Sequence, residues 1–194
     1  MENIKLKFLD KLTDESKVTL GLGALIIKDY RVQWEAEELP STPSVSVKCS
    51  NYKTKRHALP VEEQEILLEL RADCGLWCVP GGRLDPGESI EECVRREIKE
   101  ETNIDVILDD LFCVYSHPET GTLRHYLEDD FSQHVIDIFL IGLPISYKIK
   151  KSKESLDVKF FKFDNLPNNL VPTLAMAIKD YKATYRLNGK AILR

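Results

Sequence analysis

The chain has 194 residues, of which 43% are hydrophobic and 30% are charged, a composition typical of a single folded domain. Its net charge of -5 argues against long nucleic acid as a partner, because wrapping nucleic acid needs a basic surface. It leaves open a phosphorylated small molecule, whose charge metal ions can offset. No apolar run approaches the ~20 residues needed to cross a bilayer, so we expect no membrane contact. Five scattered cysteines favour a reducing, cytoplasmic location over a disulfide framework.

The first part of the chain predicts an arm, a strand and a loop. Residues 1–17 are polar and mixed in charge, and we interpret them as an N-terminal arm. The folded domain is expected to cover residues 18–194. Apolar residues at helical spacing favour a short amphipathic helix in the arm, with a loosely docked terminus as the alternative. The β-rich run Val18–Lys28 predicts a core strand. Residues 31–63 carry prolines and predict a long loop, with a short strand at Val45–Lys48.

The remaining elements alternate between strands and helices. Apolar and β-branched runs predict strands at Glu65–Arg71, Leu76–Val79, Ile104–Ser116, Val135–Leu143 and Val158–Phe163. Helical patterns occupy Glu88–Thr102, after a turn at Asp85–Gly87, and Leu170–Leu187. The segment between the strands at Ile104–Ser116 and Val135–Leu143, which contains Tyr126 and Phe131, is expected to be a long loop. This mixture predicts one α/β domain.

The helix at Glu88–Thr102 concentrates acidic residues. At ~100° per residue, Glu97, Glu100 and Glu101 fall within an arc of about 100° on one side of the helix. Val94 and Ile98 mark an adjacent apolar stripe that would hold the helix against a sheet. Crowded carboxylates repel one another unless a cation lies among them, and hard oxygen ligands suit Mg²⁺ or Mn²⁺. The alternative from charge pattern alone is a solvated helix with ordinary ion pairs.

The spacing of these residues resembles the signature of the Nudix hydrolase (MutT-like) family. That signature is Gly, five residues, Glu, seven residues, Arg-Glu, an aliphatic, any residue, Glu-Glu, any residue, Gly and an aliphatic. The chain supplies it over GRLDPGESIEECVRREIKEETNI, from Gly82 to Ile104. Asn103 stands where the family has glycine. We expect this departure to be mild, because that position ends the helix in a left-handed conformation that Asn tolerates.

The resemblance implies a fold and a set of site residues. The fold is an α/β/α sandwich, with a mixed β-sheet between helices. Glu97, Glu100 and Glu101 would bind Mg²⁺, or Mn²⁺ as a substitute, and act in catalysis, with the Gly82 carbonyl completing the coordination. By the same resemblance, Arg96 would orient a neighbouring carboxylate, and Glu88 would be a distant ligand or a helix-end partner.

Candidates outside the signature come from position in the chain. Arg71, at the end of a strand facing the signature, is a candidate for binding a phosphate of the substrate. Glu100 is the first candidate for general base, and Glu154, in a later polar loop, is the second. An ordinary exposed acid is the alternative for Glu154. Trp77 and Tyr115 are candidates for stacking on a base, with core packing the alternative for Trp77.

The resemblance implies hydrolysis of a diphosphate linkage in a nucleoside diphosphate derivative, such as ADP-ribose or a nucleotide sugar. Two alternatives stay open: pyrophosphate removal from a nucleoside triphosphate or an RNA 5′ end, and a non-catalytic domain that senses a nucleotide. The family also implies homodimerisation, for which the N-terminal arm is the candidate segment.

Overall fold

The computed structural model describes residues 6–9, 17–28, 60–127, 130–184 and 191–194. Within these ranges the chain forms ten strands, two α-helices and two short 3₁₀ helices. The helices are α1 (Ile90–Thr102), α2 (Pro172–Thr184), η2 (Val61–Glu63) and η3 (Pro118–Thr120). The strands are β1 (Leu6–Phe8), β2 (Lys17–Lys28), β3 (Glu65–Arg71), β4 (Trp77–Cys78), β5 (Gly81–Arg83), β6 (Val106–Tyr115), β7 (Leu123–Tyr126), β8 (Phe131–Pro144), β9 (Ser155–Lys162) and β10 (Ile192–Leu193). In the described part of the chain, no helix is long and apolar enough to span a membrane.

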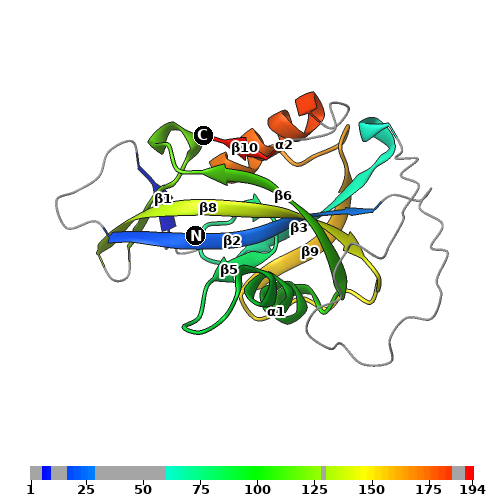
Figure 1. The fold of residues 1–194 in the computed structure, drawn as a ribbon, viewed down its shortest axis with the longest axis horizontal. Coiled ribbons are helices and arrows are strands. Elements are labelled where there is room, and N and C mark those ends of the chain that lie inside the picture. Colours follow the sequence, from blue (N-terminus) through cyan, green and yellow to red (C-terminus); the bar gives the residue numbers. More distant parts are fainter. Residues whose placement is uncertain (1–5, 10–16, 29–59, 128–129, 185–190) are drawn as a thin grey trace.

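Two long parallel strands form the centre of a curled mixed sheet. β2 pairs with β8 from Lys17 opposite Gln133 to Ile26 opposite Gly142. β8 also pairs antiparallel with β6 and β7. The end of β2 pairs antiparallel with β3, which in turn pairs with β9. Figure 1 shows the sheet with α1 beside β5 and β9 and α2 on the opposite side. This is the α/β/α sandwich that the family resemblance implied.

The second half of β2, residues 21–27, is buried on both faces because a helix covers each side of the sheet. Leu22, Ala24 and Ile26 belong to the apolar cluster that includes the inner face of α1. Leu25 and Ile27 belong to the cluster that includes α2. Alternate side chains of a strand point to opposite faces, so a near-continuous apolar run is what a doubly covered strand requires.

Capping residues set both ends of α1. Ser89 accepts a hydrogen bond from the Glu92 N–H, while the Glu92 side chain accepts one from the Ser89 N–H, so a capping box begins the helix. Val94 and Ile98 are fully buried, as the predicted apolar stripe requires. Asn103 ends the helix in the left-handed region, with φ 61°, which confirms its expected role as a substitute for glycine.

Two sequence expectations were wrong. Leu6–Phe8 is not part of an amphipathic helix but a strand, which pairs antiparallel with β7. The segment expected to be a long loop contains β7, and β8 begins at Phe131, so a hairpin replaces most of that loop. In both segments the backbone hydrogen bonds are formed by pairing with another strand, and the local pattern of apolar residues does not predict such pairing. The expected strand at Val45–Lys48 lies outside the described residues, as does most of the expected 31–63 loop.

The conformation of Asn103 has a measurable consequence. Replacing Asn103 by Ala places a β-carbon in the left-handed region and removes the hydrogen bond from Asn103 Nδ2 to the Lys148 carbonyl, 2.8 Å long. We expect the free energy of unfolding to fall by about 1–2 kcal/mol, measured by chemical denaturation. Asn103→Gly is the matched control, because it removes the same hydrogen bond without the conformational penalty. Equal losses in both variants would show that the left-handed conformation contributes nothing.

Candidate active site

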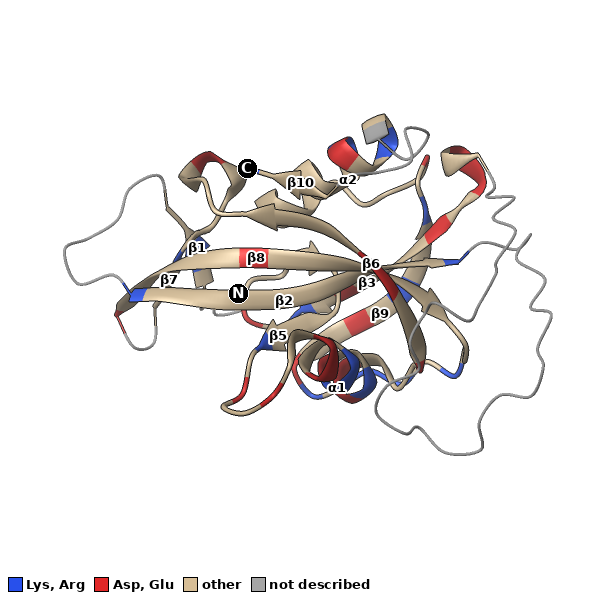
Figure 2. Ribbon diagram, in the orientation of Figure 1, with Lys and Arg blue, Asp and Glu red and all other residues tan. Residues whose placement is uncertain are grey.

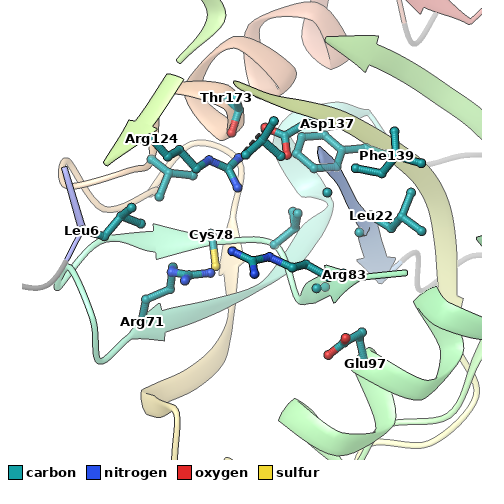
Figure 3. A pocket seen from close by; sticks show the side chains of 18 of the residues that line it. Leu6, Leu22, Arg71, Cys78, Arg83, Glu97, Arg124, Asp137, Phe139 and Thr173 are labelled. Atoms are coloured by element: carbon teal, nitrogen blue, oxygen red, sulfur yellow. Dashed lines mark hydrogen bonds and ion pairs between the residues drawn. The ribbon is translucent and has the colours of Figure 1, made fainter. Parts of the chain in front are cut away.

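A cavity of about 360 Å³ lies beside α1 and extends along the sheet. Its walls come from β1, β2, β3, β4, β5, β7, β8, α1 and the loop before β9. Figure 3 shows Glu97 at one end of this cavity and Arg124, Asp137 and Thr173 at the other, with Arg71 and Arg83 between them. Figure 2 shows that acidic and basic residues are concentrated on α1, whereas the middle of the sheet carries few charged residues.

Glu101 lines the cavity and has a carboxylate neighbour. Its Oε2 accepts a hydrogen bond of 2.8 Å from the Gly81 N–H. Burial, followed by the charge of nearby Glu69, raises the pKa of Glu101 to about 9. Glu69 lies on β3, is 3% exposed and accepts a hydrogen bond of 2.8 Å from Ser155 Oγ, and burial raises its pKa too. Glu69 was missed from the sequence; the available signal was a carboxylate inside an apolar strand.

Glu97 lines the cavity one helical turn before Glu101 and packs against the backbone of Gly82. A β-carbon on Gly82 would overlap the Glu97 carboxylate, so only glycine permits this approach. Arg96 Nη1 lies 2.9 Å from Glu97 Oε1 and fixes the carboxylate from the other side. Gly82 and Glu97 are therefore brought together, as the signature predicted.

Arg96 connects the start of the signature to the carboxylates of α1. Its Nε and Nη2 donate to the two oxygens of Glu88 at 2.7 and 3.0 Å, a bidentate pair. The Arg96 hydrogen bond is the main reason that the pKa of Glu88 falls to about 2. Arg96 Nη2 also donates to the Arg83 carbonyl at 3.2 Å. Arg96 therefore contacts Glu88 and Glu97, while the supporting roles of Arg96 and Glu88 stay predictions.

Glu100 is separated from its two neighbours. Its side chain is 62% exposed and lies 3.4 Å from Arg96 Nη1, and it is not among the residues that line the cavity. Residues four apart lie on one line of a helix, so Glu97 and Glu101 share a direction while Glu100 is rotated away. Its predicted role as general base is not tested by this arrangement.

A family model described as "NUDIX domain" matches residues 45–184, which is most of the chain and includes the whole of α1 and the cavity-lining strands β3, β4 and β5. The chain belongs to the NUDIX hydrolase family.

Individual NUDIX relatives agree with this assignment. The chain is 36% identical over 121 residues to a provisionally named 8-oxo-dGTP diphosphatase of Bacillus subtilis, covering 62% of this chain and 73% of that one. It is 36% identical over 107 residues to an ADP-ribose pyrophosphatase of Methanocaldococcus jannaschii, covering 55% of this chain and 57% of that one. The crystal structure of a NUDIX hydrolase from Nitrosomonas europaea shares the fold, with a TM-score of 0.57, 18% identity, and coverage of 94% of this chain and 81% of that one.

The donor set fits a divalent cation of the kind NUDIX hydrolases use. Within the described ranges, His, Cys, Asp and Glu side chains form no ready-made group of three ligands. Mg²⁺, however, usually takes only one or two carboxylates and completes its shell with water and substrate phosphates. Glu97 and Glu101 face one cavity, and the Oε2 of Glu69, the charged neighbour of Glu101, is buried without a hydrogen-bond partner among the described residues. Such an excess of buried, poorly satisfied carboxylate oxygen suits a hard cation.

Both candidates from outside the signature line the cavity. Arg71 pairs with Asp73, with Nε donating to Oδ1 at 2.8 Å and Nη2 donating to Oδ2. Glu154 is exposed, and its backbone N–H donates to Ser152 Oγ at 3.0 Å. The cavity thus brings Arg71 and Glu154 together with Glu97 and Glu101, although their substrate-binding roles stay predictions.

The two aromatic candidates do not line the cavity. Trp77 is 6% exposed and packs edge-on against Phe161, which confirms the core-packing alternative. Tyr115 is fully buried and donates a hydrogen bond of 2.7 Å to Asp180. Stacking of Tyr115 on a base was therefore a wrong expectation, because α2 covers the face of the sheet to which its side chain points.

The far end of the cavity holds a buried ion pair that the sequence did not reveal. Arg124 Nη2 donates to Asp137 Oδ2, and the exposed fractions of their side chains are 17% and 3%. Burial raises the pKa of Asp137, opposed by the positive charge of Arg124. Nearby, the Arg83 guanidinium lies 5.3 Å from the centroid of the Tyr126 ring. The available signal for Asp137 was a single charge within the apolar run of β8.

The raised pKa of Glu101 predicts a pH dependence of stability. Between the ordinary value of 4.5 and about 9, the folded protein holds a proton that the unfolded chain has released. Stability of the metal-free protein should therefore fall as the pH rises through this interval. Thermal unfolding from pH 5 to pH 9 would measure it, and Glu101→Gln should make the profile flatter. A wild-type profile that rises across the interval, or one unchanged by Glu101→Gln, would contradict the prediction.

Proposed function

We propose that the chain is a Mg²⁺-dependent pyrophosphohydrolase that cleaves the diphosphate linkage of a nucleoside diphosphate derivative, such as ADP-ribose or a nucleotide sugar. The observation that carries this proposal is the position of Glu97 and Glu101. They lie one helical turn apart, in one cavity, against the backbone of Gly81 and Gly82. A diphosphate with its cations fits a site that combines paired carboxylates with guanidinium groups.

Each residue has a task in this proposal. Glu97 and Glu101 would hold the cation, with the Gly82 carbonyl as a further oxygen ligand. Arg96 would keep Glu97 oriented through its 2.9 Å contact, while its bidentate pair with Glu88 fixes the guanidinium. Arg83, for which the described residues provide an amide oxygen and an aromatic ring but no carboxylate partner, would face the anionic substrate.

The proposed reaction is attack of water on one phosphorus, which breaks one bond to the bridging oxygen and releases two phosphorylated products. A bound divalent cation would neutralise phosphate oxygens and lower the pKa of the attacking water. The general base has two predicted candidates, Glu100 and Glu154. The cavity favours Glu154, because it lines the wall while Glu100 points toward Arg96 and solvent.

Nucleoside triphosphates form a second candidate substrate class. The Bacillus subtilis relative, of which this chain covers 73%, is named for 8-oxo-dGTP, whereas the Methanocaldococcus jannaschii relative is named for ADP-ribose. Both classes carry a diphosphate that the same carboxylates would engage. An RNA 5′ end is a weaker fit, because the net charge of -5 would repel a long polyanion.

A purely nucleotide-sensing role is the alternative from another class. A protein that only binds nucleotides would not need Glu97 and Glu101 side by side. It would also not need a glycine at position 82 to leave room for the Glu97 carboxylate. Keeping like charges together in a partly buried site is unfavourable unless a cation is bound, so their presence supports catalysis.

The test is a Mg²⁺-dependent product assay across ADP-ribose, nucleotide sugars, nucleoside triphosphates including 8-oxo-dGTP, and a 5′-triphosphorylated RNA. We expect turnover of at least one nucleoside diphosphate derivative. Glu97→Gln and Glu101→Gln should each lower kcat at least about a hundredfold while the protein stays folded, because each removes a ligand of the cation.

Glu91→Gln is the matched control, because Glu91 lies on α1, 56% exposed, in an ion pair with Arg95 outside the cavity. Tight nucleotide binding without turnover of any compound would favour the sensor. Wild-type turnover in Glu97→Gln and Glu101→Gln would exclude the proposed mechanism.

A further inference from the structure

The Arg124–Asp137 pair lies at the end of the cavity opposite Glu97, and the proposed reaction does not use it (Figure 3). β7 supplies Arg124 and β8 supplies Asp137, and these adjacent antiparallel strands hold the two side chains together. Asp137 is also held by a hydrogen bond from Thr173 of α2. Three elements thus fix this pair in place, which is the construction expected of a specificity site.

The hydrogen bonds of this pair are incomplete. Arg124 Nε is buried and has no hydrogen-bond partner among the described residues, although the guanidinium borders the cavity. Its Nη2 is used by Asp137. A buried donor without a partner is unfavourable, and native proteins seldom keep one without a ligand, a water or a functional reason. A small shift of the guanidinium toward a bound acceptor would satisfy it.

Charge at this end argues for a neutral acceptor rather than another phosphate. The Asp137 carboxylate offsets the Arg124 charge, and a second anion would approach that carboxylate in a poorly solvated place. The surrounding walls are apolar and partly aromatic, formed by Leu6, Phe8, Val135 and Phe139. The Arg124 guanidinium already lies 6.0 Å from the centroid of the Phe8 ring. Apolar walls with one oriented donor suit a flat heterocycle that carries a carbonyl.

We propose that Arg124, held by Asp137, binds the ring carbonyl of the substrate's base and makes the enzyme prefer hypoxanthine, guanine or uracil over adenine. Adenine presents an amino group where hypoxanthine presents a carbonyl, so it would leave the Arg124 donor unpaired and add a second donor beside it. This proposal rests on the proposed function and refines it, moving the expected substrate from adenine nucleotides to nucleotides with a keto base.

Two measurements separate failure of this proposal from failure of the proposed function. Calorimetry without metal compares the binding of inosine and adenosine monophosphates. Their bases differ at position 6, a carbonyl in one and an amino group in the other, and at N1, which carries a proton only in hypoxanthine. A second assay measures Mg²⁺-dependent hydrolysis. It compares kcat/KM between inosine and adenosine triphosphates, and between inosine diphosphate ribose and adenosine diphosphate ribose. We expect inosine compounds to be favoured at least about tenfold in both assays, the size of a lost hydrogen bond to a charged group.

Arg124→Lys keeps the positive charge beside Asp137 but removes the planar donor group. It should bring the inosine-to-adenosine ratio close to one, mainly by weakening inosine binding. Arg124→Met combined with Asp137→Leu should do the same without leaving a buried carboxylate unpaired, which guards against simple misfolding. Arg95→Lys, on α1 outside the cavity, is the control and should keep the wild-type ratio.

Equal binding of the two monophosphates by the wild type, binding of neither, or an equal loss of both in Arg124→Lys would overturn the proposal. Absence of hydrolysis of every nucleotide, together with a clear inosine preference in metal-free binding, would instead reject the proposed function and leave the base preference standing.

Discussion

The central physical constraint in this structure is the placement of carboxylates close together in a partly buried site. Glu69 and Glu101 are both buried and lie close enough for their charges to interact, and Glu97 lies one turn before Glu101. Without a cation, burial and mutual repulsion force Glu101 to hold a proton well above its ordinary pKa. A bound cation would relieve this repulsion, which is why the carboxylates support the proposed Mg²⁺ site.

The rest of the fold holds those carboxylates against their repulsion. α1 is fixed to the sheet by the buried Val94 and Ile98, and its first turn is fixed by the Ser89 capping box. Arg96 contacts both Glu88 and Glu97, so it connects the loop before the helix to the side of α1 that faces the cavity. Glycine at position 82 lets the strand backbone approach the Glu97 carboxylate closely, because a β-carbon there would overlap it.

Local sequence was informative where the chemistry is local. The spacing from Gly82 to Ile104 predicted the helix, its left-handed end at Asn103 and the pairing of Glu97 with Gly82, since all of these lie within two dozen residues. It could not distinguish Glu100 from its neighbours, because a few tens of degrees of helix rotation decide which side chain enters the cavity.

What the sequence could not reveal depends on contacts between distant strands. Glu69 meets Glu101, and Arg124 meets Asp137, only after β3, β7 and β8 have paired. Leu6–Phe8 becomes a strand because β7 offers it an edge, although its own apolar spacing suggested a helix.

The long parallel pairing of β2 with β8 has a consequence for biosynthesis. Leu20 lies opposite Ile136 in that register. β2 can therefore form this pairing only with a strand that is synthesised more than a hundred residues later. Such distant contacts slow folding and leave apolar strand edges uncovered in the meantime. The growing chain would therefore leave Leu22–Ile27 exposed to solvent or to chaperones for most of its synthesis, and α1 would be made before β6 and β8 of the sheet that supports it.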